Sequence, residues 1–77
     1  MNERVLEYIG FREADLDEEH REFAEWLEEV DAICQEKVPL SIFDLPDFLW
    51  RSYHDDGTSP QVALEAFFEA EEMEEFL

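Results

Sequence analysis

The segment DLDEEHREFAEWLEEVD, residues 15–31, constrains the fold of this chain more than any other, because nine of its seventeen residues are carboxylates. Arg21 is the one basic residue within it. Like charges on neighbouring turns of a helix repel one another, so a helix here must keep its acids on the solvent side. The whole chain shares this bias, with 23 acidic and 5 basic residues and a formal net charge of −18. Self-repulsion of that size disfavours a compact state.

Apolar residues are nevertheless abundant enough to form a core. The chain is 45% hydrophobic and 14% aromatic, whereas acidic chains with few aromatic residues are typically disordered. A length of 77 residues allows one small domain, and such a domain folds with a narrow margin of stability. We therefore expect a single folded domain over residues 1–77 that tolerates its charge because the charge has a use.

The cysteine content and the hydropathy of the chain indicate the cellular compartment that we expect for it. Cys34 is the single cysteine, so neither an internal disulfide nor a cysteine-based metal site is expected. The N-terminal residues do not resemble a signal peptide. No apolar stretch approaches the roughly 20 residues that span a bilayer, and we expect a cytoplasmic protein that binds no membrane. The negative charge argues against direct binding of nucleic acid and favours an electropositive partner.

The first half of the chain contains two expected elements. Residues 2–9 fit a helix ending at Gly10, although their β-branched and aromatic content also allows a strand. A helix is expected from about 16 to 36, with Asp15 as its N-cap and Glu18 completing a capping box. Apolar residues recur along it at spacings of three and four, which predicts one buried stripe. The stripe consists of Phe23, Trp26, Leu27, Val30, Ile33 and Cys34.

Two further helices are expected in the second half. One lies within residues 41–53, with Asp44 as its N-cap and Pro46 in its first turn. Its inward face is predicted to hold Phe43, Leu45, Phe48, Leu49 and Tyr53. The other begins at Thr58 or Ser59 and runs toward residue 76. Its predicted buried stripe is Ala63, Ala66, Phe67, Ala70 and Met73. The expected fold is mainly α, a compact bundle of three or four helices.

The acids of the 16–36 helix lie off its apolar stripe. Glu18, Glu22, Glu25, Glu29 and Glu36 follow one another there, with Glu28 and Asp31 on their flanks. Positions seven apart are about 10 Å apart along a helix axis, a spacing on the scale of nucleic-acid phosphates. A second acidic group follows near the C-terminus, and a third lies in the turn before it. These groups are Glu65, Glu69 and Glu72 with Glu71, Glu74 and Glu75 beside them, and Asp55 with Asp56.

Three interpretations of this charge compete. Solvated helix faces usually mix signs, because Glu–Lys pairs four residues apart support a helix, but here the acids are hardly mixed with bases. Adaptation to high salt is a second interpretation, against which Glu outnumbers Asp sixteen to seven. The third is an electrostatic decoy that presents carboxylates in place of phosphates, and it is the interpretation we favour.

In DLDEEHREFAEWLEEVD, EAEEMEEFL and its small size, the chain resembles the DNA-mimicking inhibitors of phages and mobile elements. This class includes anti-restriction proteins, uracil-DNA glycosylase inhibitors and several anti-CRISPR proteins. The resemblance is one of charge pattern and size, so no family's functional residue is carried over. It implies a non-enzymatic inhibitor that occupies the basic nucleic-acid-binding surface of a host protein. A CRISPR surveillance complex is the first expected target, then a restriction enzyme, then a DNA-repair enzyme.

The remaining candidates are an aromatic anchor and weak enzyme signals. Trp50 falls beside Arg51 and away from the Phe48–Leu49 face in the expected helix, so it is predicted either to complete the bundle or to form an apolar anchor with Tyr53 and Phe68. The two histidines and the crowded acids match no catalytic or metal-binding motif, and neither a cofactor nor a metal is expected.

The predicted partner-binding residues are therefore Glu18, Glu22, Glu25, Glu28, Glu29, Asp55, Asp56, Glu65, Glu69, Glu72 and Trp50. One alternative is an acidic interaction module or adaptor that binds a partner through a hydrophobic groove. The other is an acidic enzyme with a carboxylate metal site. The sequence leaves the target and the oligomeric state open.

Overall fold

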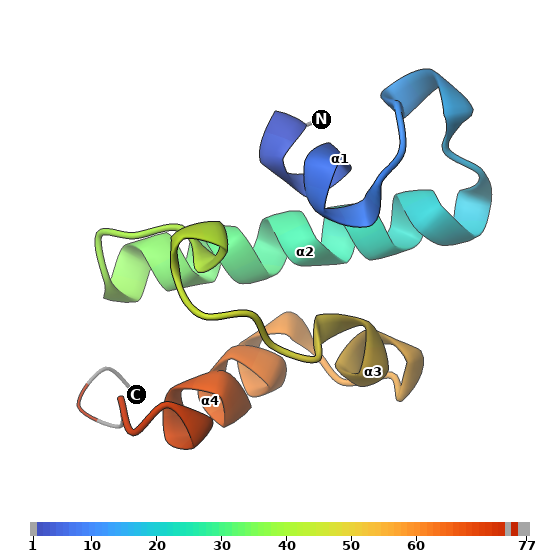
Figure 1. Cartoon of the computed structure of the whole chain (residues 1–77). Coiled ribbons are helices and arrows are strands. Elements are labelled where there is room, and N and C mark those ends of the chain that lie inside the picture. The colour runs from blue at the N-terminus through green and yellow to red at the C-terminus, as the bar shows by residue number, and fades with distance from the viewer. Residues whose placement is uncertain (1, 74, 76–77) are drawn as a thin grey trace.

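The structure is a computed structural model that describes residues 2–73 and 75. Within that part of the chain it contains four α-helices, two single 3-10 turns and no strand (Figure 1). The helices are α1 (Glu3–Ile9), α2 (Glu18–Lys37), α3 (Trp50–Asp55) and α4 (Pro60–Ala70), and the 3-10 turns are η1 (Glu13–Asp15) and η2 (Ile42–Asp44). The mainly α class and the small helical bundle predicted from the sequence are confirmed.

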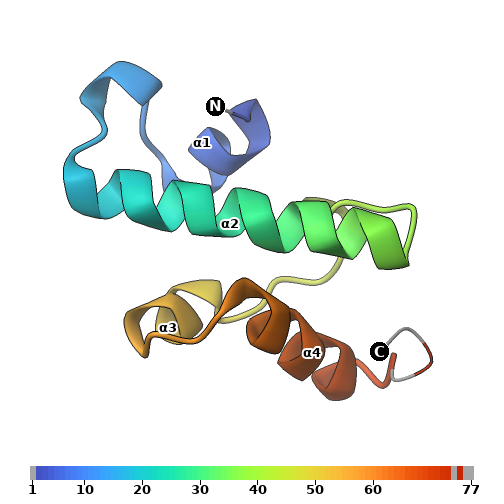
Figure 2. The same cartoon turned by 180° about the vertical axis from the view of Figure 1, so that it is seen from behind.

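Helix α2 is the central element of the bundle. It spans the width of the molecule, with α1 on one side and α3 and α4 on the other (Figures 1 and 2). Helix α4 packs along α2, while α1, α3 and η2 make smaller contacts with it. The result is a flattened body of 39 × 25 × 17 Å, in which much of α2 remains at the surface.

The two N-terminal helices begin at side-chain caps. Asn2 accepts a hydrogen bond from the backbone N–H of Arg4, and α1 ends at Gly10 in the left-handed conformation, which glycine adopts without a steric penalty. Residues 2–9 therefore form a helix rather than a strand. Asp17 caps α2 by accepting from the backbone N–H of His20. The predicted cap, Asp15, lies instead in η1, two residues upstream.

The third predicted helix is much shorter than expected, because it begins only at Trp50. Proline disfavours helical conformation in the residue before it, and Leu45, which precedes Pro46, is extended. Ser41 caps the short η2 turn. Asp44 was the predicted N-cap, but it ends η2 and its carboxylate is bound by Arg4. The chain from Leu45 to Leu49 forms no helix.

Helix α4 begins as predicted, with Ser59 as N-cap and Pro60 in the first turn, but it ends at Ala70. Negative charge near a helix C-terminus is unfavourable, and acidic residues follow directly, with Glu72 in the left-handed region at a φ of 59°. Residues 74 and 76 of the predicted helix lie outside the described residues. The buried face is also rotated from the predicted stripe: Ala66 is half-buried and Ala70 is exposed. The residues it buries are Ala63, Leu64, Phe67 and Phe68.

The core lies between α2 and the α3–α4 pair. Leu27 and Phe67 are fully buried there, as predicted. Trp26 was predicted to belong to the core but is only partly buried, and its indole Nε1 donates a hydrogen bond to the backbone oxygen of Thr58 at 2.9 Å. Trp50 takes the central position instead, with its ring centroid 5.4 Å from that of Phe67. Packing of aromatic rings thus joins α3 to α4.

Candidate partner-binding surface

Five glutamates form an exposed line along α2, which we call the α2 acidic row. It consists of Glu18, Glu22, Glu25, Glu29 and Glu36. None of the five has a hydrogen-bond or ion-pair partner within residues 2–73 and 75. At 1.5 Å per residue the row extends about 27 Å from its first member to its last. The predicted separation of acids from the apolar stripe is therefore present, and the row is free to meet a partner.

Other acids of α2 are used by the fold itself. Glu28 accepts a hydrogen bond from the backbone N–H of Asn2 at 2.7 Å, which fixes the start of α1 against α2. Asp31 was predicted to flank the row, but it is buried and accepts hydrogen bonds from the Ser41 hydroxyl and from the backbone N–H of Ile42. Asp31 therefore supports the fold and adds no charge to the surface.

An arginine joins the N-terminal end of α2 to α3. The guanidinium of Arg51 donates to Glu19 at 2.9 Å and to Asp55 at 3.0 and 3.2 Å. It also lies over the ring of Phe23, 5.1 Å from the centroid. Asp55, one of the predicted partner-binding residues, is thus already paired. Asp56, which follows it, is exposed and has no partner among the described residues.

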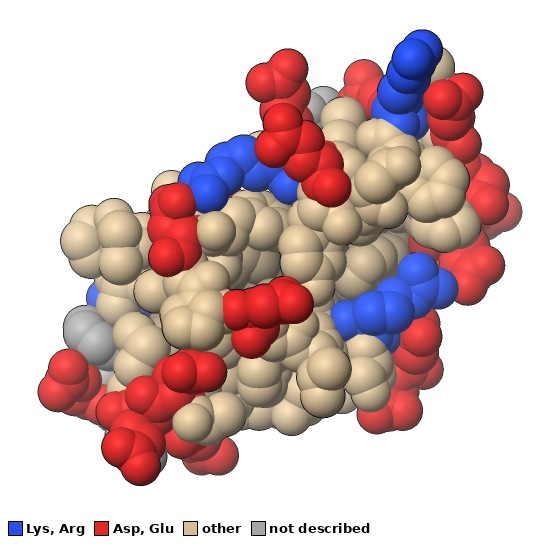
Figure 3. Space-filling view, viewed as in Figure 1, with Lys and Arg blue, Asp and Glu red and all other residues tan. Residues whose placement is uncertain are grey.

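A second acidic group lies on α4 and in the turn that follows it. Glu65 is half-buried, whereas Glu69 and Glu72 are exposed. Acidic side chains gather over the C-terminal end of α4 and at the far end of the same face (Figure 3). Between them the same view shows uncharged residues interrupted by separate acidic and basic side chains, so the acids form no continuous patch on this face (Figure 3).

Of the two alternatives predicted for Trp50, the structure shows the one in which it completes the bundle, so its place among the predicted partner-binding residues is wrong, and Phe68 forms no exposed anchor either. Trp50 is 2% exposed and Phe68 is fully buried. The Trp50 ring lies 4.9 Å from that of Phe48 and so belongs to the face that it was predicted to avoid. The prediction assumed a helix that begins at Asp44, whereas α3 begins at Trp50. Because the residues between them are not helical, the side chain of Trp50 points in a different direction from the one predicted. Tyr53 is half-buried and stacks on Phe48 at 5.3 Å.

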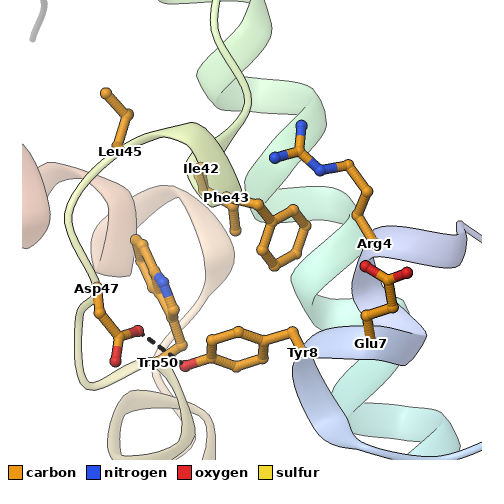
Figure 4. Close-up of a pocket in the computed structure, with 8 residues that line it drawn as sticks. All are labelled: Arg4, Glu7, Tyr8, Ile42, Phe43, Leu45, Asp47 and Trp50. Atoms are coloured by element: carbon orange, nitrogen blue, oxygen red, sulfur yellow. Dashed lines mark hydrogen bonds between the residues drawn. The ribbon is translucent and has the colours of Figure 1, made fainter.

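A pocket that the sequence analysis missed lies between α1 and the segment from η2 to α3 (Figure 4). Its volume is about 340 Å³, at the lower end of the range for ligand pockets. The apolar residues that line it are Tyr8, Ile42, Phe43, Leu45 and Trp50, and the charged ones are Arg4, Glu7 and Asp47. Because these residues are up to 46 positions apart, no local pattern could reveal the pocket.

Near the pocket, large apolar side chains are exposed. Leu49, which follows the pocket residue Asp47 by two positions, is 72% exposed, and Tyr8 is 39% exposed. The Tyr8 hydroxyl lies 3.4 Å from a carboxylate oxygen of Asp47, and burial raises the pKa of Tyr8. An aromatic surface thus lies next to the carboxylate of Asp47, one oxygen of which also accepts from the backbone N–H of Phe48 at 3.0 Å.

Three features bear on other kinds of site. Among the described residues, no three or more histidine, cysteine or acidic side chains are grouped so that they could hold a metal ion. Cys34 is buried, as predicted, and burial raises the pKa of its thiol to about 11. No helix in the described part of the chain combines the length and apolarity needed to cross a membrane.

Comparisons with protein-family models, with curated proteins and with solved structures found no match for this chain.

Proposed function

We propose that the protein is a non-enzymatic inhibitor that mimics nucleic acid and occupies the basic nucleic-acid-binding groove of another protein. The observation that carries the proposal is the α2 acidic row, an exposed line of unpaired glutamates on the central helix. Arg and Lys side chains that normally hold phosphates would pair with these carboxylates, and nucleic acid would be excluded.

The arrangement of the charged residues supports this proposal over simple solubility. Two of the five basic residues, Arg4 and Arg51, are committed to acids outside the row. The fold thus pairs some acids and leaves the row unpaired, although pairs of Glu and Lys four residues apart would support the helix. Phage and mobile-element inhibitors are the class that this charge pattern resembles. A CRISPR surveillance complex remains the first candidate target, followed by restriction and DNA-repair enzymes.

The test is a DNA-competition titration. Candidate targets are recovered by pull-down from host lysate and purified, and labelled DNA bound to each target is displaced with the parent protein. Displacement is expected to weaken steeply with added salt, because it replaces many phosphate contacts. Glu25→Gln alone should weaken it only modestly, since single exposed ion pairs contribute roughly 0–1 kcal/mol. Reversal of Glu18, Glu22, Glu25 and Glu29 to Lys should abolish it.

Two double variants test whether competition with DNA depends on the position of the acids or only on the total charge of the protein. Both variants change the net charge by the same amount, and all the positions changed are exposed. The row variant combines Glu22→Lys with Glu25→Lys, and the control variant combines Glu3→Lys with Glu71→Lys. The row variant should lose most of the competition and the other variant should retain most of it. Simultaneous binding of protein and DNA to the target, or equal loss in both double variants, would rule out the mimic.

The second candidate function is an acidic adaptor that binds a partner through apolar contacts. The pocket between α1 and the η2–α3 segment, with Leu49 exposed nearby, is the observation that favours it. Apolar binding survives added salt, whereas binding through the α2 acidic row does not. Binding to the purified target that persists at 0.5 M salt (about 4 Å screening length) would favour the adaptor.

A further inference from the structure

The molecule places two of its arginines in the same chemical setting. Arg4 lies over the ring of Phe43, 5.7 Å from its centroid, and donates to both carboxylate oxygens of Asp44 at 2.7 and 3.1 Å. Arg51 lies over Phe23, and its Nε donates to both carboxylate oxygens of Asp55. An aromatic face combined with a carboxylate is a favourable site for a guanidinium, since both attract its charge and suit its planar shape.

The pocket offers a further aromatic face beside carboxylates, that of Tyr8, and no arginine of the described residues lies over this ring. Tyr8 supplies a partly exposed ring whose centroid is 5.6 Å from that of Phe43. One oxygen of Asp47 accepts from the Tyr8 hydroxyl and from the backbone N–H of Phe48, and Glu7 is exposed with no hydrogen bond or ion pair among the described residues (Figure 4). Arg4 also lines the pocket, but Asp44 holds both of its terminal nitrogens.

The charged residues around the pocket indicate which kind of ligand it can bind. Arg4 and Asp44 offset each other, which leaves the two carboxylates of Glu7 and Asp47. An anionic ligand is therefore disfavoured. A second copy of this chain is disfavoured as well, because each copy carries a formal net charge of −18. The aromatic and aliphatic lining suits the methylene stem of a long cationic side chain.

We infer that this pocket binds one arginine side chain of a basic partner protein, with the guanidinium against Tyr8 and Phe43 and its charge met by Asp47 and Glu7. The inference rests on the proposed function only for the basic character of the partner. A pocket that admits one arginine at a fixed position would let the protein select among basic surfaces, which the α2 acidic row attracts in general.

The test uses capped amino acids as probes and needs no target protein. N-acetyl-arginine methylamide is titrated into the full chain at low ionic strength, and the ring resonances of Tyr8 and Phe43 are followed by NMR. Saturable shifts and intermolecular NOEs from the arginine methylenes to both rings are expected. The citrulline analogue has the same shape without the charge, and it should bind at least tenfold more weakly.

Two double variants separate the pocket from general attraction by the acidic chain. Glu7→Gln with Asp47→Asn should weaken arginine binding about tenfold. Glu22→Gln with Glu25→Gln removes the same charge from the α2 acidic row and should change binding less than twofold. All four positions are exposed, and circular dichroism checks that each variant is folded. The inference would be overturned if the parent protein showed NOEs to other residues only, or if its shifts did not saturate. It would also be overturned if the citrulline analogue bound as tightly as the arginine probe, or if both double variants lost the same amount of binding.

Failure of this inference and failure of the proposed function give different results. The probe titration contains neither nucleic acid nor target, so it is unaffected if the α2 acidic row does not compete with DNA. Conversely, a mimic that lacks an arginine pocket would still displace DNA and would show no NOEs at Tyr8 and Phe43.

Discussion

The hydroxyl of Ser41 donates a hydrogen bond of 2.8 Å to the carboxylate of Asp31, ten residues earlier in the chain. The same carboxylate oxygen accepts from the backbone N–H of Ile42 at 2.9 Å, and its second oxygen accepts from Gln35. Asp31 is only 4% exposed. One member of the acidic segment thus faces inward and ties α2 to η2, while the α2 acidic row faces solvent.

Asp31→Ala should destabilise the fold by roughly 2–4 kcal/mol, because it leaves the buried donors of Ser41 and Ile42 without an acceptor. Chemical denaturation measures this change in the free energy of unfolding. Glu25→Ala on the exposed side of the same helix is the control and should stay within about 0.5 kcal/mol of the parent. Equal effects in the two variants would mean that the Asp31 hydrogen bonds do not hold α2 to η2.

Leu27→Ala and Phe67→Ala should each lower the free energy of unfolding by roughly 2–5 kcal/mol, as expected for large-to-small changes in a core. Both side chains are fully buried, one on α2 and one on α4. Leu49→Ala serves as the comparison, because Leu49 is mostly exposed and its truncation should have little effect. A Leu27→Ala variant that melts like the parent would contradict the buried face of α2, and with it the orientation of the acidic row.

The Arg4–Asp44 pair makes a prediction about pH. The paired hydrogen bonds from Arg4 lower the pKa of the Asp44 carboxyl below its ordinary value. A lowered folded-state pKa means that the pair stabilises the fold above a pH of about 4. This stabilisation is lost as the pH falls through the folded-state pKa. Arg4→Gln should move the pKa of Asp44 back up, as measured by the NMR shift of its carboxyl carbon.

The control for that titration is Arg21→Gln. Arg21 is exposed and makes no contact with Asp44, so its removal changes the net charge equally and should leave the Asp44 midpoint nearly unchanged. A similar shift in both variants would mean that the low pKa reflects overall charge rather than the Arg4 contact.

Added salt should raise the melting temperature, because it screens the repulsion among the surface carboxylates of a chain with a formal net charge of −18. Thermal melts from low to moderate salt measure the effect. A variant with Glu18, Glu22, Glu25 and Glu29 changed to Gln should melt at a higher temperature in low salt and gain less from added salt. A parent melting curve that does not move with salt would show that the charges are already neutralised.

The existence of α2 and α4 and the faces of α2 could be predicted from the sequence, because they depend on neighbours three and four residues apart. The apolar stripe from Phe23 to Cys34 and the capped start of α4 at Ser59 are both local patterns, and both are present in the structure. The exposed α2 acidic row follows from the same periodicity, since its five members lie off the stripe, on the side of α2 opposite its buried residues. Asp31 is also off the stripe, and it is buried because Ser41 and Ile42 bind it.

Tertiary contacts determined the features of the structure that local sequence patterns could not predict. Asp44 had the sequence of a helix cap, yet Arg4, forty residues away, binds it, and α3 starts at Trp50. That later start rotates Trp50 into the core, which removes it from the predicted binding set. The pocket beside Tyr8 likewise exists only because α1 packs near residues 42–50. Spacing along one helix fixes which way a side chain points relative to its neighbours, but only the packing of distant segments fixes which side chains meet.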